Sequence, residues 1–156
     1  MLKNKTPFIF IVLALSLSVF SAELQLEVRN ITAAGIIHIA VYDSKEVFES
    51  DRGDKPGPQP GIINGLVQDV KEGQFSTTFS LPEGKYAVGL YIDSNENEKL
   101  DTNFFGIPKE QFGFSNNAKG LFGPPDFESA AFIIDSDQRI VIELSLIHIS
   151  EPTRPY

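Results

Sequence analysis

The segment Asp93–Asp101, DSNENEKLD, carries oxygen-bearing side chains at every second position directly after a hydrophobic stretch. Alternating carboxylate and amide oxygens, followed by a backbone carbonyl, form the ligand pattern of EF-hand-type calcium loops. Counting Asp93 as position one, the predicted ligands at alternate positions are Asp93, Asn95, Asn97, the carbonyl of Lys99, and Asp101. The spacing therefore predicts a Ca²⁺ site in this loop.

Two positions of this loop depart from the EF-hand pattern. Position six, where such loops use Gly for a sharp turn, is Glu98, and position twelve, where they use a bidentate Glu, is Phe104. Without that last ligand we expect a weak or structural site, in the range of about 10⁻⁴ to 10⁻³ M seen for extracellular modules. The alternative is a polar loop tip whose Asp and Asn side chains cap turns.

A second candidate site follows in residues 104–127. This segment holds six of the 13 Phe residues, together with four Gly and three Pro, and shows no regular periodicity. Long stretches of this kind are usually functional or form packed Ω-like loops. One prediction is an aromatic surface that binds carbohydrate or peptide, formed by Phe105, Phe112, Phe114 and Phe122. The alternative is that these rings plug one end of the fold, since aromatic side chains belong more often to a core.

The chain offers few residues for catalysis. It has no Cys, which excludes disulfides, thiolate metal sites and Cys nucleophiles. His38, the only histidine ahead of the C-terminal tail, lies in an apolar stretch, so no Ser-His-Asp set can be assembled. We therefore predict that the protein is not an enzyme. The remaining alternative, a carboxylate-based hydrolase, would use a pair such as Asp101 with Glu110 or Asp126 with Glu128.

Residues 1–22 have the pattern of a secretory signal peptide. Two lysines precede an apolar run over Phe8–Phe20, and the small residues Ser21 and Ala22 follow. The run is shorter than the roughly 20 residues that span a bilayer. We therefore predict cleavage, with Ser21 favoured as the last residue removed, and a periplasmic or secreted bacterial location.

The C-terminal residues 144–154, LSLIHISEPTR, resemble the in-frame translation of a transposase-based sequencing adapter. We therefore predict that residues 144–156 are a non-native scar and that the domain spans residues 23–143. This length fits one domain with a single hydrophobic core.

The domain is acidic. The full chain has 13 Lys and Arg against 21 Asp and Glu; without Lys3, Lys5, Arg154 and Glu151 the counts are 10 and 20, a net charge of −10. Nucleic acids and anionic lipids are bound through basic patches. We therefore expect no nucleic-acid partner and, after signal cleavage, no membrane partner.

The elements around these candidates follow a period of two, which is typical of half-buried strands. Strands are expected at Leu24–Val28, Ile36–Tyr42, Leu66–Val70, Phe75–Leu81, Tyr86–Ile92, Ala131–Ile134 and Ile140–Glu143. One short helix is expected at Ser44–Ser50, with Ser44 as its cap. This pattern predicts an all-β fold: a single antiparallel immunoglobulin-like or transthyretin-like sandwich of about seven strands, with a long Gly/Pro/Phe-rich loop.

The segment Leu81–Tyr86, LPEGKY, predicts a β-turn between two of these strands. Pro82 presets φ at the second turn position and Gly84 suits its end. Tyr86 then opens the next strand, where a tyrosine corner would bond its hydroxyl to upstream backbone.

Several of these motifs together resemble one family. They are DSNEN with LDTN at Asp93–Asn103, GIPKE at Gly106–Glu110, FGFSNNA at Phe112–Ala118 and FGPPDF at Phe122–Phe127. They resemble the domain of unknown function family 2141, a group of exported bacterial proteins, over nearly the whole mature chain. The resemblance implies a β-sandwich and an exported location, and it brings no catalytic residues. The family usually has Gly at the position of Glu98.

Overall fold

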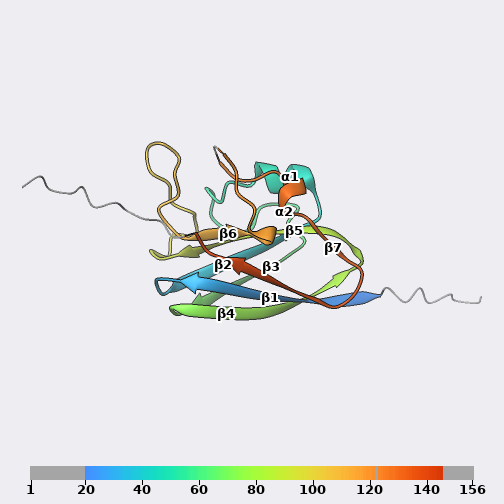
Figure 1. Ribbon diagram of the computed structural model, residues 1–156. Helices are drawn as coiled ribbons and strands as arrows, with labels where there is room; N and C mark the ends of the chain where they lie inside the picture. The colour runs from blue at the N-terminus through green and yellow to red at the C-terminus, as the bar shows by residue number, and fades with distance from the viewer. Residues whose placement is uncertain (1–19, 122, 146–156) are drawn as a thin grey trace, which may run out of the picture.

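The computed structural model describes residues 20–121 and 123–145, and two β-sheets packed face to face make up most of this part (Figure 1). One sheet has three strands in the order β4-β1-β8, and the other has the order β3-β2-β5-β6, with β7 also paired to β5. The strands are β1 Ser21–Ile31, β2 Gly35–Tyr42, β3 Asn64–Val70, β4 Gly73–Pro82, β5 Gly84–Asp93, β6 Phe112–Phe114, β7 Phe132–Ile134 and β8 Gln138–Glu143. The helices are α1 Lys45–Ser50 and α2 Phe127–Ala130, with a 3₁₀ turn at Ser115–Asn117.

The main core lies between the two sheets. Alternate residues of β1 and β5 are buried there, among them Leu24, Leu26, Val88 and Ile92, which are at most 1% exposed. Burial of each large aliphatic side chain stabilises the fold by about 1.5–3 kcal/mol. Among the described residues, no helix is long and apolar enough to cross a membrane.

The structure confirms the predicted all-β sandwich but differs from it in detail. The described residues contain eight strands, and β1 pairs with β8 in parallel, with Leu26 opposite Ile140. Two elements were not predicted: strand β6 lies within residues 104–127, and helix α2 begins at the last residue of that segment, Phe127. Both span fewer than five residues, which is too short to show a period in the sequence.

Residues on both sides of each predicted domain boundary are part of the fold. Strand β1 begins at Ser21, and Ala22 is fully buried opposite Leu81. At the other end Leu144 is 3% exposed, and its N–H donates to the carbonyl of Arg29. Residues 1–19 and 146–156, which hold most of the predicted signal and tail, lie outside the described residues.

Helix α1 begins where the sequence predicts. Ser44 has extended backbone angles and its Oγ accepts a hydrogen bond from the N–H of Val47 at 3.4 Å. This cap satisfies one of the free N–H groups of the first turn. Phe48, on the inner side of the helix, is 3% exposed.

The predicted tyrosine corner is present, and its removal should be measurable. The Tyr86 hydroxyl donates to the carbonyl of Pro82 at 2.8 Å, across the turn from β4 to β5. Because the change leaves this carbonyl without its partner, Tyr86→Phe is expected to lower the free energy of unfolding by about 1–1.5 kcal/mol, read from urea denaturation. Tyr91→Phe is the matched control, since the Tyr91 hydroxyl has no hydrogen bond among the described residues. Equal losses in the two variants would contradict the role of the corner.

Candidate functional site

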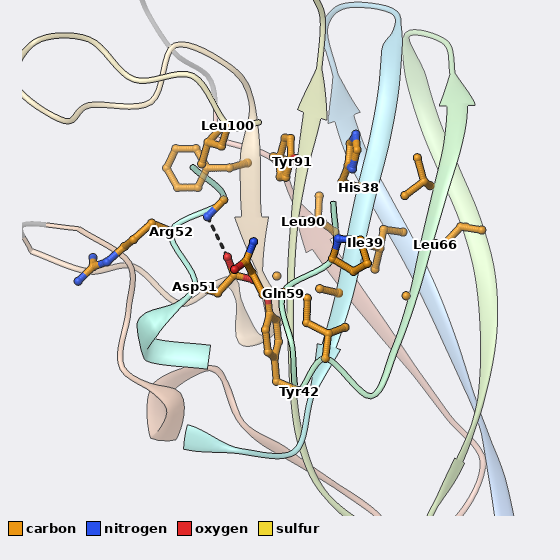
Figure 2. Close-up of a pocket in the computed structure, with 18 of the residues that line it drawn as sticks. His38, Ile39, Tyr42, Asp51, Arg52, Gln59, Leu66, Leu90, Tyr91 and Leu100 are labelled. Atoms are coloured by element: carbon orange, nitrogen blue, oxygen red, sulfur yellow. Dashed lines mark hydrogen bonds between the residues drawn. The ribbon is translucent and has the colours of Figure 1, made fainter. Parts of the chain in front are cut away.

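Small residues leave a hollow on the outer face of the five-stranded sheet. Ala40 of β2 lies opposite Gly65 of β3 on one side and Gly89 of β5 on the other. Three neighbouring strands therefore place no bulky side chain at this level of the sheet. A groove of about 510 Å³ lies over them (Figure 2).

Larger side chains wall the groove on both sides. One cross-strand row contains Val67, His38, Tyr91 and Phe112, as the strand register shows. The rings of His38 and Tyr91 are stacked, with centroids 4.7 Å apart and an interplanar angle of 2°. On the other side Tyr42 contributes a ring, and Phe114 of β6, opposite Gly89, closes one end of the row of small residues.

The loop after α1 covers part of this groove. Asp51 holds the loop in place: its Oδ2 accepts from the Tyr42 hydroxyl at 2.8 Å, and its Oδ1 accepts from the N–H of Gly53 at 2.9 Å (Figure 2). The carbonyl of Gly53 then accepts from the N–H of Leu100 at 2.7 Å. The covering loop and the predicted calcium loop are thus joined, and Glu98 and Leu100 line one end of the groove.

Asp93 organises the predicted calcium loop from a fully buried position. Its Oδ1 accepts from the N–H of Asn97 at 3.2 Å and its Oδ2 from the N–H of Glu98 at 2.7 Å. Glu98, at position six, has a φ of 63°, in the left-handed region that Gly adopts most readily. The sharp turn therefore forms here without glycine.

The exposed side of the same loop gathers three more predicted ligands. Asn95 Nδ2 donates to Asp101 at 2.6 Å, and Asn97 Nδ2 donates to both Asp101 oxygens at 2.9 and 3.0 Å. Hydrogen bonds from Asn97 and Asn95 hold the pKa of Asp101 below its ordinary value of 3.8. Lys99, the fifth predicted ligand, donates its N–H to Asn97 Oδ1 at 3.0 Å.

A buried glutamate braces the loop at both ends. Glu110 Oε1 accepts from the N–H of Ser94 at 2.9 Å, and Oε2 accepts from the N–H of Asp101 at 3.0 Å. Sequence reasoning considered Glu110 only as one half of a hydrolase pair and missed this role. Its sequence separation from Ser94 leaves no local pattern that would reveal the contact. Within the described ranges, no three His, Cys, Asp or Glu side chains form a cluster that could hold a metal.

The four predicted aromatic ligand residues are divided by the fold. Phe112 and Phe114 come from β6, are half-buried and line the groove. Phe105 is 82% exposed at the tip of a hairpin over residues 101–109, which stands away from both sheets (Figure 1). Phe122 lies outside the described residues. Sequence reasoning missed the partners of Phe112 and Phe114 in the groove, namely His38, Tyr42 and Tyr91.

The left-handed backbone at Glu98 leads to a prediction for stability. A left-handed conformation costs a non-glycine residue about 1–2 kcal/mol. Gly avoids this cost but destabilises the fold by about 0.5–1 kcal/mol, because it loses more conformational entropy on folding. We therefore expect Glu98→Gly to raise the free energy of unfolding by about 0.5–1 kcal/mol in urea denaturation. Glu83→Gly, at an exposed turn position without positive φ, should destabilise instead. A Glu98→Gly variant no more stable than the native chain would contradict the prediction.

The fold and the groove together define an all-β sandwich domain with a candidate ligand site on the outer face of one sheet. The chain belongs to the bacterial family described as uncharacterized protein conserved in bacteria, DUF2141, whose family model matches residues 26–142. The match confirms the family that the sequence motifs indicate. Neither a curated protein nor a solved structure matches the chain significantly.

Proposed function

We propose that this protein is an exported, non-enzymatic binding domain that holds a small ring-bearing ligand in the groove on its five-stranded sheet. The observation that carries the proposal is the row of small residues Gly65–Ala40–Gly89, with the stacked rings of His38 and Tyr91 on one side and the ring of Tyr42 on the other. Both ligand classes that the aromatic segment suggests, carbohydrate and peptide, present rings or flat apolar groups.

The size and lining of the groove support binding. Ligand pockets are commonly 300–1,000 Å³, mostly apolar, with a few placed polar groups, and this groove has about 510 Å³. Its polar groups include Asp51, whose two oxygens already bond Tyr42 and Gly53. This arrangement favours recognition over chemistry, because the carboxylate is used to hold the loop.

A variant whose groove is blocked by a large side chain tests the proposal. Val67 is 63% exposed and lies opposite His38, so Val67→Trp places an indole across the groove without disturbing the core. The probe is 1-naphthalenemethanol, a neutral aromatic molecule, titrated by calorimetry. We expect binding by the native chain and at least about a tenfold loss in Val67→Trp, since fully burying a large apolar group is worth about 1.5–3 kcal/mol.

The matched control is Thr78→Trp, an exposed position on β4 of the other sheet. It should bind the probe as the native chain does. Equal binding by the two Trp variants would contradict the proposal, and so would a native chain that binds neither this probe nor a charged probe with the same ring body. Thermal melts establish that both variants are folded.

A calcium site in the Asp93–Asp101 loop is a second candidate function. The observation that favours it is the pair of hydrogen bonds from positions five and six to Asp93, together with the left-handed position six. Rotation of the Asn95 and Asn97 amides by 180° would turn their oxygens toward Asp101 and toward a cation. This loop would then supply oxygen ligands, which suit Ca²⁺.

Thermal melts in 10 mM CaCl₂ against chelator test this second candidate. A site of about 10⁻³ M affinity would stabilise the fold by about 1.4 kcal/mol, which is a shift of several degrees for a domain of this size. The double variant Asn95→Ala with Asp101→Asn should lose the shift. A native midpoint that calcium leaves unchanged, or that MgCl₂ raises equally, would count against a calcium site.

The N-terminal pattern supports export, and the position of the cleaved peptide bond tests it. Ala22 is fully buried opposite Leu81, so cleavage after Ser21 keeps this contact in the mature protein, whereas cleavage after Ala22 removes it. We expect mass spectrometry of the protein from a bacterial periplasmic fraction to show an N-terminus at Ala22. Unprocessed chain in the cytoplasmic fraction would contradict export.

A further inference from the structure

Four carboxylates surround the Tyr91 end of the groove. Asp51 and Glu98 line it, Asp93 lies with its Oδ2 3.6 Å from His38 Nε2, and Glu110 is buried beneath the neighbouring loop. Burial raises the pKa of the Tyr91 hydroxyl, and the charges of these four carboxylates raise it further.

Three of these carboxylates accept hydrogen bonds from backbone N–H groups or a hydroxyl, rather than from cationic side chains. Asp93 and Glu110 each accept two backbone N–H groups, and Asp51 accepts one N–H and the Tyr42 hydroxyl. In the part of the chain that the structure describes, Asp51, Glu98 and Glu110 take part in no ion pair. Neutral donors stabilise a carboxylate without cancelling its charge, so this end of the groove is negative.

Two of the basic residues nearby, Arg52 and Lys55, also line the groove. Arg52 and Lys55 are exposed on the covering loop, and Figure 2 shows the Arg52 side chain extending away from Tyr91 and His38. Lys99 and Lys109 act on Asp101, on the other side of the calcium loop. His38 is the remaining titratable group at the groove, and its Nε2 is buried without a hydrogen-bond partner among the described residues.

We propose that the groove selects an organic cation, an amine or quaternary ammonium carried on an apolar ring body, with the positive group seated at the Tyr91–His38 end. This proposal rests on the groove being a ligand site. Aromatic faces attract cations, most strongly where water is excluded, and Tyr91, His38 and Phe112 form a continuous aromatic row there. The groove over Ala40 and Gly65 then receives the apolar body.

A metal ion fits this end of the groove less well. Ca²⁺ requires six to eight oxygen ligands at 2.3–2.6 Å, whereas here the groove surface is mostly apolar and the oxygens of Asp93 already accept backbone N–H groups. An ammonium group bound over rings needs only a negative field and apolar contact. Both are present at the Tyr91 end.

Three probes with one ring body separate charge from shape. They are 1-naphthylmethylammonium, 1-naphthalenemethanol and 1-naphthoate, titrated into the full chain by calorimetry at pH 7 and low salt. We expect the ammonium probe to bind at least about tenfold more tightly than the neutral one, and the carboxylate probe to bind most weakly. Added salt should reduce the advantage of the ammonium probe, because it screens charges.

Variants of the calcium loop supply the matched test. Glu98→Gln removes a carboxylate that lines the groove and should weaken binding of the ammonium probe about threefold to tenfold more than binding of the neutral probe. Glu96→Gln, two residues away and outside the lining, is the control and should change neither.

The outcomes distinguish this proposal from the function on which it rests. If the neutral probe binds but the ammonium probe binds no more tightly, the cation proposal is wrong and the groove remains a ligand site. If the carboxylate probe binds most tightly, Arg52 and Lys55 set the selectivity and the proposal is likewise wrong. If none of the three probes binds, the groove is not a ligand site and both proposals are wrong.

Discussion

Replacing Phe48 by Ala is expected to lower the free energy of unfolding by about 3–5 kcal/mol, the largest loss we foresee for a single change outside the main core. Phe48 is 3% exposed, and its ring packs edge-on against three others. The centroid distances are 5.2 Å to Tyr42, 5.8 Å to Phe114 and 5.8 Å to Phe127. Truncation would leave a cavity among rings from α1, β2, β6 and α2.

Phe48 belongs to a second, smaller core, so its truncation is expected to affect more than its immediate neighbours. This core lies on the outer face of the five-stranded sheet, over Ala87, and includes Tyr42 and Phe114, which also wall the groove. We therefore expect Phe48→Ala to weaken binding of 1-naphthalenemethanol as well, because the wall residues lose their support. Urea denaturation measures the stability and calorimetry the binding.

Phe105→Ala is the matched control, since it removes the same ring from a position that is 82% exposed. Its effect on stability should stay within about 0.5 kcal/mol, as for most surface substitutions. A loss below about 1.5 kcal/mol in Phe48→Ala, or a comparable loss in Phe105→Ala, would show that the small core does not hold these elements together.

The period-two pattern was sufficient to predict most of the sandwich. Each of the seven expected strands is present, because alternation along one strand reports directly which face is buried. The pattern could not show that β1 pairs with β8 in parallel. Pairing depends on contacts between residues more than 100 positions apart, such as Leu26 with Ile140, and one strand's alternation carries no information about its partner.

The second core and the groove were missed for a related reason. A period-two reading assigns one face of a strand to the core and the other to solvent, whereas the second face of the five-stranded sheet is partly covered by α1 and α2. The available signal was the small size of Ala40, Ala87 and Gly89 on that second face. Only the strand register brings Ala40 and Gly89 together with Gly65 and reveals the hollow.

The residues predicted to bind calcium lie together in one loop, but the hydrogen bonds within that loop were not predicted from the sequence. Alternation of Asp and Asn identified residues that the fold does gather in one loop. The hydrogen bonds from Asn97 and Glu98 to Asp93 explain why the first residue of the loop is buried, which the ligand pattern alone does not predict. A calcium site and a capped turn use the same residues, so the sequence left both open.

Asp93→Ala addresses this alternative and is expected to lower the free energy of unfolding by about 2–4 kcal/mol. Asp93 is fully buried, and both its oxygens accept backbone N–H groups, from Asn97 and Glu98. Leaving a buried N–H group unsatisfied costs about 1–3 kcal/mol, and the two hydrogen bonds lost here are part-buried, so together they account for about 2–4 kcal/mol. Urea denaturation in chelator measures this structural contribution alone.

Asn95→Ala, at an exposed position of the same loop, should cost less than about 1 kcal/mol and serves as the control. Asp93→Asn keeps one oxygen acceptor and should fall between the two. If Asp93 only caps the turn, the loss in Asp93→Ala is the same in chelator and in 10 mM CaCl₂. If Asp93 also binds calcium, the loss is larger in CaCl₂, because the native chain alone gains stability from the bound ion.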